Sequence, residues 1–112
     1  MPVASRRRLR ALACFAVAAT AAVAWSQPQL AGPSFDCSKA ASDAEKLICA
    51  DGLLSRLDRE LAVQYAAAKA RASDPAKFRR QGIAEWKLRE GCKSDRDCLV
   101  LWYAKRSVDL SR

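Results

Sequence analysis

The sequence predicts an all-α fold, a small antiparallel helical hairpin or bundle of about four helices stapled by two disulfides. Apolar residues beyond position 42 recur at steps of three and four, which is the spacing of amphipathic helices. Capping residues, glycines and a proline divide that region into four such segments. Four cysteines lie beyond position 36, and an even number in a short exported chain is typical of a disulfide framework. No segment shows the alternation expected of a strand.

The N-terminal region has the features of a signal peptide. Four arginines within residues 6–10 precede an apolar run from Ala11 to Trp25, which is too short to span a bilayer comfortably. Residues 1–26 are therefore predicted to be a signal peptide, with cleavage after Ala24 or after Ser26. Cleavage leaves no integral membrane anchor and predicts a periplasmic or secreted protein.

Other interpretations of this region stay open. An uncleaved run would act as a membrane anchor, and Cys14 would be the attachment point of a lipoprotein. The lipoprotein is the weaker alternative because a lipidated cysteine follows the apolar run, whereas Cys14 lies near its start. The arginines also allow a twin-arginine export route, although the residues around them match that signal poorly.

The charge of the exported part is mildly basic. The whole chain has 20 Lys and Arg against 12 Asp and Glu, and four of the arginines belong to the signal peptide, so the rest carries a net charge of about +4. These charges are interspersed, which is typical of a solvated mixed surface. Because there is no basic stripe with stacking aromatic residues, no nucleic-acid partner is predicted.

The exported part begins with a short polar segment and a first helix. Residues 27–34 contain two prolines and a glycine and are expected to be a disordered lead-in, so the folded unit starts near Phe35. Ser42 and Glu45 form a capping box, which predicts a helix over residues 43–50. The pair Asp51-Gly52 ends it.

Three longer helices follow, each with its own start and stop residues. A helix over 53–71 carries an apolar stripe, and Ser73-Asp74-Pro75 then starts a helix that lasts to Glu90. Ser94 or Asp95 can cap a fourth helix over 96–110. The residues expected to face inward are Leu47, Ile48 and Cys49; Leu54, Leu57, Leu61, Tyr65 and Ala68; Phe78, Ile83 and Trp86; and Leu99, Trp102, Tyr103 and Leu110. The short connections predict that the second and third helices form a hairpin, with the first and fourth packed at its ends.

The four cysteines Cys37, Cys49, Cys92 and Cys98 permit three pairings. The segment after Cys37 is long enough to fold back along the first helix to Cys49, while Cys92 and Cys98 flank the last helix corner. Long closures would constrain the unfolded chain more, but proximity favours the local pairing. A metal site is not expected, because the chain has no histidine and neither pair has the spacing of a zinc knuckle.

The residues predict no enzyme and no cofactor. With the cysteines oxidised, the remaining candidates are carboxylate pairs such as Asp58 with Glu60 and Glu85 with Glu90. Residues two apart point to different helix faces, and the second pair lies among Lys and Arg residues that suggest surface ion pairs. The large aromatic residues of the last two helices are expected in the core.

The cysteine frame and its flanking residues resemble the lysozyme inhibitor LprI-like N-terminal domain family. The residues that carry the resemblance are Phe35-Asp36-Cys37-x-Lys39-Ala40, Glu45-x-x-Ile48-Cys49, Leu54-x-x-Leu57-Asp58-x-x-Leu61-x-x-x-Tyr65, and Trp86, Arg89, Cys92, Cys98-Leu99, Tyr103, Arg106 and Leu110. The match covers residues 35–112. Two departures are that Trp86 lies one residue nearer to Cys92 than is usual and that Gly82 lies in mid-helix.

The resemblance implies a periplasmic or secreted helical domain, associated in some members with inhibition of lysozyme. The structural family motif comprises Leu57, Asp58, Leu61, Tyr65, Trp86, Arg89, Tyr103 and Arg106. Within it, Asp58 is expected to pair with Arg89 or Arg106 between helices. Contacts to a hydrolase are expected from exposed residues near Cys37 or between Cys92 and Cys98.

Two functions therefore follow from the sequence. The first, which the resemblance implies, is a binding protein that inhibits lysozyme or another cell-wall hydrolase. Many lysozymes are strongly basic, so a +4 inhibitor would be repelled at long range. Short-range complementarity would offset this repulsion, and so would a local acidic patch, such as Asp95 with Asp97, or Asp36 with Asp43 and Glu45. The alternative is a non-enzymatic envelope accessory protein that binds wall polymers or an anionic membrane surface.

Overall fold

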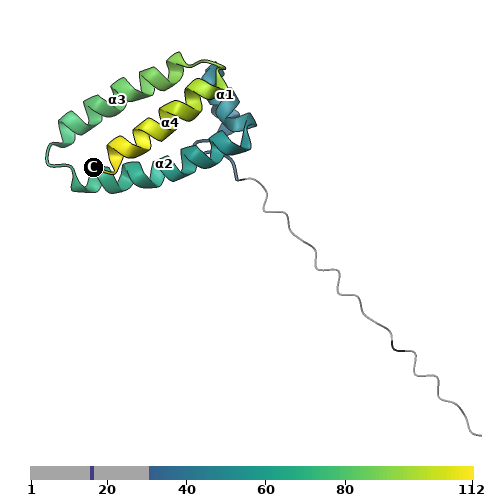
Figure 1. The fold of residues 1–112 in the computed structure, drawn as a ribbon, viewed down its shortest axis with the longest axis horizontal. Helices are drawn as coiled ribbons and strands as arrows, with labels where there is room; N and C mark the ends of the chain where they lie inside the picture. The colour runs from purple at the N-terminus through teal and green to yellow at the C-terminus, as the bar shows by residue number, and fades with distance from the viewer. Residues whose placement is uncertain (1–15, 17–30) are drawn as a thin grey trace, which may run out of the picture.

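The computed structural model describes Ala16 and residues 31–112, and the predicted signal peptide, apart from Ala16, lies outside the described residues. The described chain forms a short 3-10 helix and four α-helices, and no strand occurs within it. The elements are η1 (Cys37–Lys39), α1 (Asp43–Ala50), α2 (Gly52–Arg71), α3 (Pro75–Gly91) and α4 (Arg96–Leu110) (Figure 1). The predicted all-α fold class is confirmed. No helix among residues 31–112 is both long and apolar enough to cross a membrane.

Side-chain caps start all four α-helices. Ser42 and Glu45 form the predicted capping box, with Ser42 Oγ accepting from Glu45 N at 3.0 Å. Asp51 accepts from the backbone N–H of Leu54, and Asp74 and Asp95 cap α3 and α4 in the same way. These local bonds explain why the predicted helix boundaries agree with the observed ones to within about a residue.

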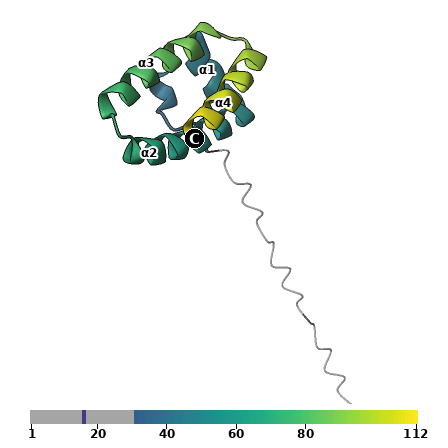
Figure 2. The ribbon, with the colours of Figure 1, turned by 60° about the vertical axis from the view of Figure 1, so that its left-hand side comes forward.

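The packing of the helices differs from the predicted arrangement. α2 packs most extensively along α4, while α1 packs on α2 and on α3. Figures 1 and 2 both show α1 at the end where α3 leads into α4, with the α2–α3 turn at the opposite end. The predicted α2–α3 hairpin is wrong, because α2 packs along α4 and leaves the apolar residues of α3 largely uncovered.

The core lies at the end of the molecule that contains α1. Its fully buried members come from α1, α2 and α4 and include Ile48, Leu54, Leu99 and Tyr103. In contrast, Ile83 and Trp86 of α3 are 51% and 50% exposed, so the prediction that they face inward is wrong.

One disulfide joins η1 to α1, and the other joins the end of α3 to α4. Cys37 is bonded to Cys49 and Cys92 to Cys98, with Cα–Cα distances of 5.9 and 5.5 Å. The local pairing is confirmed. Cys92 is itself part of the buried cluster, with 8% of its surface exposed.

The last residues of the predicted lead-in belong to the folded unit. Residues 31–34 have no helical structure, but the backbone carbonyls of Ala31 and Gly32 accept hydrogen bonds from Arg59. Ser34 donates to Asp58 of α2. The predicted start at Phe35 is therefore a few residues late, because these partners lie 24 or more positions away in the sequence.

Candidate binding site

Asp58 of α2 is the centre of a buried polar cluster. One carboxylate oxygen accepts from the hydroxyl of Tyr103 on α4 at 2.7 Å. The other accepts from the backbone N–H and the hydroxyl of Ser34 at 2.7 and 2.5 Å, and Arg89 Nη1 lies 3.9 Å from Asp58 Oδ1. The carboxylate thus connects α2, α3, α4 and the segment before η1, which is a structural role.

Arg89 is the ion-pair partner of Asp58, for which the sequence offered both Arg89 and Arg106. Its guanidinium donates to Glu90 at 2.6 Å and lies 5.8 Å from the ring centre of Phe35. Burial by itself lowers the pKa of Arg89, but the hydrogen bond to Glu90 and the nearby acidic groups outweigh that effect and raise it. Arg89 therefore stays charged inside the protein.

Tyr103 is held neutral by the same cluster. Burial, followed by the negative charge of Asp58 and the hydrogen bond to it, raises the pKa of the Tyr103 hydroxyl far above its usual range. A hydroxyl in this state donates a hydrogen bond and does not act as a base. Asp58, Arg89 and Tyr103 consequently fix the positions of three helices.

A groove of about 430 Å³ opens between α2, α3 and α4. It lies beside the Asp58 cluster. Its main apolar lining residues are Leu61 and Tyr65 from α2, Ile83 and Trp86 from α3, and Trp102 from α4. The groove has the size and the mainly apolar character of a small-ligand site.

Gly82 lets the backbone of α3 lie close to Tyr65 of α2 beside the groove. A Cβ atom at this position would lie 3.2 Å from the hydroxyl oxygen of Tyr65 and 3.5 Å from its Cε2. The missing side chain lets the Tyr65 ring lie against the backbone of α3, and the ring also contacts Phe78 at a centroid distance of 5.0 Å. The mid-helix glycine therefore has a packing reason.

Arg106 of α4 is a second buried arginine with different surroundings. Its exposed fraction is 8%, and it makes no hydrogen bond or ion pair with any residue in the described part of the chain. It lines the groove and also a neighbouring cavity of about 320 Å³ near the C-terminus. The predicted ion pair of Asp58 is therefore made by Arg89 and not by Arg106.

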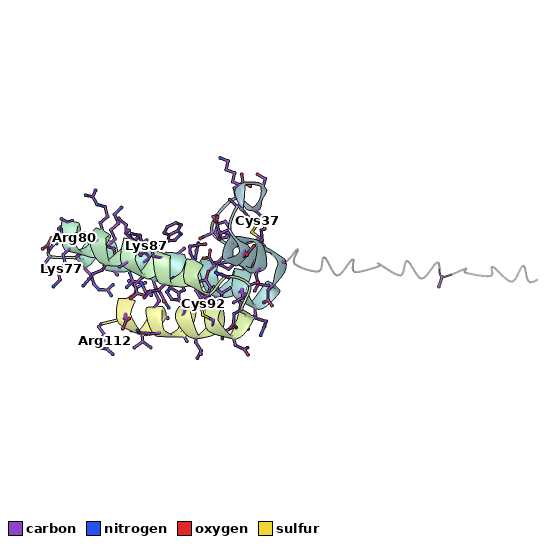
Figure 3. All side chains as sticks on the ribbon, turned by 90° about the horizontal axis from the view of Figure 1, so that it is seen from above. Cys37, Lys77, Arg80, Lys87, Cys92 and Arg112 are labelled. Carbon is purple, nitrogen blue, oxygen red and sulfur yellow. A yellow bond between two sulfur atoms is a disulfide. The ribbon has the colours of Figure 1, made fainter. Side chains whose placement is uncertain are left out.

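The two disulfide-closed loops lie at one end of the molecule. Figure 3 shows Cys37 and Cys92 toward the end opposite to Lys77, Arg80 and Arg112. Arg96, inside the second loop, forms an ion pair with Asp51, which lies two residues beyond Cys49, and Arg96 Nε is 2.6 Å from Asp51 Oδ2.

Charge and backbone geometry distinguish these loops further. The hydrogen bond from Arg96 is the main cause that lowers the pKa of Asp51. Lys93, next to Cys92, has a positive φ of 52°, in the left-handed region that residues other than glycine adopt uncommonly. Its side chain is exposed. The stapled corners thus present charged side chains on a constrained backbone.

The structure separates the predicted motif residues into three groups. Leu57 and Leu61 pack against the core, whereas Asp58, Arg89 and Tyr103 form the polar cluster. Tyr65, Trp86 and Arg106 line the groove.

Sequence reasoning missed Ser34 and Arg79, which also line the groove, and the exposed position of Ile83. Ser34 lacked any sequence signal because it lies in an irregular segment. The basic start of α3, in contrast, was visible in the sequence.

Comparison with known proteins gives no match to a family model, a curated protein or a solved structure. Among the described residues there is also no group of three or more side chains suited to hold a metal ion. The arrangement offers constrained charged loops at one end and an apolar groove with a buried cation in the middle. Both features suit binding.

Proposed function

We propose that this protein is an exported binding protein that inhibits a lysozyme-type cell-wall hydrolase through its stapled end. The observation that carries the proposal is that both disulfide-closed segments lie at one end of the molecule (Figure 3), where Arg96 of the second segment pairs with Asp51 at the start of α2, two residues beyond Cys49. Loops held in one conformation lose little entropy on binding, so their contacts contribute more fully to affinity. The disulfides fit the oxidising periplasm or exterior, where such hydrolases act.

The charge distribution supports this docking surface. Segments 36–51 and 93–97, at the stapled end, together carry six acidic and four basic residues. Segment 69–80, at the other end, carries five basic residues and one acidic residue. A basic hydrolase would approach the acidic end preferentially, so the positive net charge of the whole protein does not prevent association. The resemblance to the LprI-like family points to the same class of partner.

The test is a turbidity assay in which lysozyme lyses bacterial cell walls while the oxidised mature protein is titrated in. We expect lysis to stop near a one-to-one ratio. A reduced and alkylated sample is the control and should not inhibit, because the loops are then unconstrained. Full lysis across several lysozyme types with the oxidised protein would refute the proposal.

A pair of charge reversals tests the docking surface. Asp97 and Asp109 are both exposed on α4, at opposite ends, and neither makes a hydrogen bond or ion pair with another described residue. Asp97→Lys and Asp109→Lys change the net charge equally. We expect Asp97→Lys to slow association with lysozyme severalfold and Asp109→Lys to leave it nearly unchanged. Equal effects would show that the stapled end is not the surface used.

A second candidate function follows from the opposite end of the molecule. Lys77, Arg80 and Arg112 extend there from the body (Figure 3), which suits an envelope accessory protein that binds wall polymers or an anionic membrane surface. This function predicts salt-sensitive sedimentation with cell walls or anionic vesicles, reduced by Lys77→Glu with Arg80→Glu. It also predicts no effect on lysozyme.

A further inference from the structure

Arg106 carries a charge that nothing in the described part of the chain balances directly. The residue is 8% exposed, yet among the described residues no carboxylate lies within ion-pair distance of it and no acceptor is bonded to it. Burying an unpaired cation is costly, so such a group is ordinarily paired or in contact with a ligand. Arg89, the comparably buried arginine, has both Asp58 and Glu90.

The guanidinium of Arg106 is not fully shielded from solvent. The described polar side-chain atoms that are fully shielded from solvent and lack a partner are Glu90 Oε2 and Trp102 Nε1. The nitrogen atoms of Arg106 are not among them, and the residue lines the groove wall. The guanidinium thus keeps contact with solvent, and a molecule in the groove lies against the same residue, which also lines the neighbouring cavity.

The rest of the groove offers apolar surface next to that cation. Ile83 and Trp86 are about half exposed although they are large and apolar, and they face the same space as Trp102. Exposed apolar side chains gathered at one concave site indicate a ligand or partner surface.

The other charged groups of the groove favour an anion. Arg79 adds a second cation from α3. The two lining carboxylates differ in availability: both oxygens of Asp58 already accept hydrogen bonds, whereas Glu85 lies on the α3 side of the groove without an ion-pair partner among the described residues. Arg106 is thus the buried charge of the groove that lacks an ion-pair partner among the described residues. Glu85, in contrast, is partly exposed to water.

We propose that this groove binds a small amphiphilic anion, in which an apolar chain lies against Ile83, Trp86 and Trp102 while a carboxylate accepts hydrogen bonds from Arg106. A planar guanidinium binds a carboxylate through two parallel hydrogen bonds, which fixes the orientation of the ligand. The volume of about 430 Å³ suits one short chain. This site is separate from the stapled end and does not depend on hydrolase inhibition.

The test is isothermal titration calorimetry of the oxidised mature protein with octanoate, and with octanol as the neutral control of equal length. We expect octanoate to bind about tenfold or more tightly than octanol, because one charge-assisted hydrogen-bonded pair is gained. Equal affinity for the two molecules, or no binding of octanoate, would overturn the proposal.

Three variants assign the effect to the groove. Arg106→Met should remove the preference for octanoate and leave octanol binding, whereas Trp86→Ala should weaken both. Arg56→Met, which removes an exposed arginine of α2 outside the groove, is the matched control and should change neither. Retention of the octanoate preference in Arg106→Met would contradict the site.

A folding failure of Arg106→Met and self-association through the groove each have their own test. If Arg106→Met does not fold, Arg79→Gln at an exposed position tests the same preference, which should then fall severalfold. Analytical ultracentrifugation tests a second copy as the occupant. A dimer that Trp86→Ala converts to a monomer, and that octanoate does not dissociate, would assign the groove to self-association and overturn the proposal.

Discussion

At the residue scale, the described fold depends on a small number of polar groups in the interior. Asp58 is 6% exposed and receives hydrogen bonds from residues 24 and 45 positions away. A buried carboxylate with several donors is stable only while those donors remain, and the donors are stable only while it remains. The two ends of the chain segment from Ser34 to Tyr103 are held together in this way.

Removal of Asp58 should therefore be strongly destabilising. We expect Asp58→Ala to lower the free energy of unfolding by about 3 kcal/mol, because Arg89 then loses one of its buried partners and Tyr103 its acceptor. Glu60→Ala, which removes the exposed pair with Arg56, is the control and should change it by about 0.5 kcal/mol or less. Urea unfolding followed by circular dichroism measures both, and similar losses would show that the cluster is not special.

Tyr103 should make stability fall at high pH. Its pKa is raised in the folded state above its usual value of 10.0, so the stabilisation is fully present below pH 10 and is lost as the pH rises further. The loss should approach about 1.4 kcal/mol per pH unit.

Ultraviolet absorbance can test this in Tyr65→Phe, where Tyr103 is the one tyrosine left of the two in the chain. Tyrosinate absorbance should appear together with the loss of helical circular dichroism. Ionisation near pH 10 in a helical protein would contradict the buried hydrogen bond.

At the scale of elements, α3 differs from the other helices. α1, α2 and α4 bury apolar residues against one another, whereas the one buried residue of α3 is Arg89 near its C-terminal end. α3 is held at one end by the core and near the other by the contact of Tyr65 with Gly82 and Phe78. The groove lies between these two attachments.

The Tyr65–Gly82 contact predicts a coupling between these positions. Gly82→Ala favours the helix by up to about 1 kcal/mol, but the new Cβ atom meets the Tyr65 hydroxyl. In the Tyr65→Phe background the hydroxyl is absent, so Gly82→Ala should be more stabilising there, by about 0.5 kcal/mol. A double-mutant cycle in urea measures the difference, and additive effects would mean that the two side chains do not interact.

At the scale of the whole molecule, the two disulfides stabilise different parts of the fold. Cys37 is exposed and its bond ties η1 to α1, whereas Cys92 lies in the core between α3 and α4. The bonds close loops of sequence separation 12 and 6. By loop entropy these closures contribute about 3 and about 2.5 kcal/mol to the free energy of unfolding. Loop length alone therefore makes the Cys37–Cys49 bond the more stabilising of the two.

Burial should reverse that order. Cys92→Ala with Cys98→Ala removes sulfur atoms from the core as well as a cross-link, so we expect it to lower the melting temperature more than Cys37→Ala with Cys49→Ala. Differential scanning calorimetry of the two double variants tests the order. A larger loss from the Cys37–Cys49 pair would show that chain entropy dominates.

The sequence by itself determined the local features of this protein. Caps such as Ser42 with Glu45, the stop at Asp51, the helix bounds and the local disulfide pairing all depend on residues close together in the chain, and the described structure agrees with them. The choice of Asp58 as an ion-pair residue was also correct, with Arg89 as its partner.

Only the tertiary structure decided which surfaces meet. The periodicity of α3 predicted Ile83 and Trp86 as core residues, but a helical stripe does not state whether another helix is available to cover it. α2 uses its apolar face on α4, so the stripe of α3 stays half exposed and forms a groove. The burial of Arg106 without an ion-pair partner among the described residues, and the bond from Ser34 to Asp58, likewise arise from contacts between distant segments, which residue spacing does not encode.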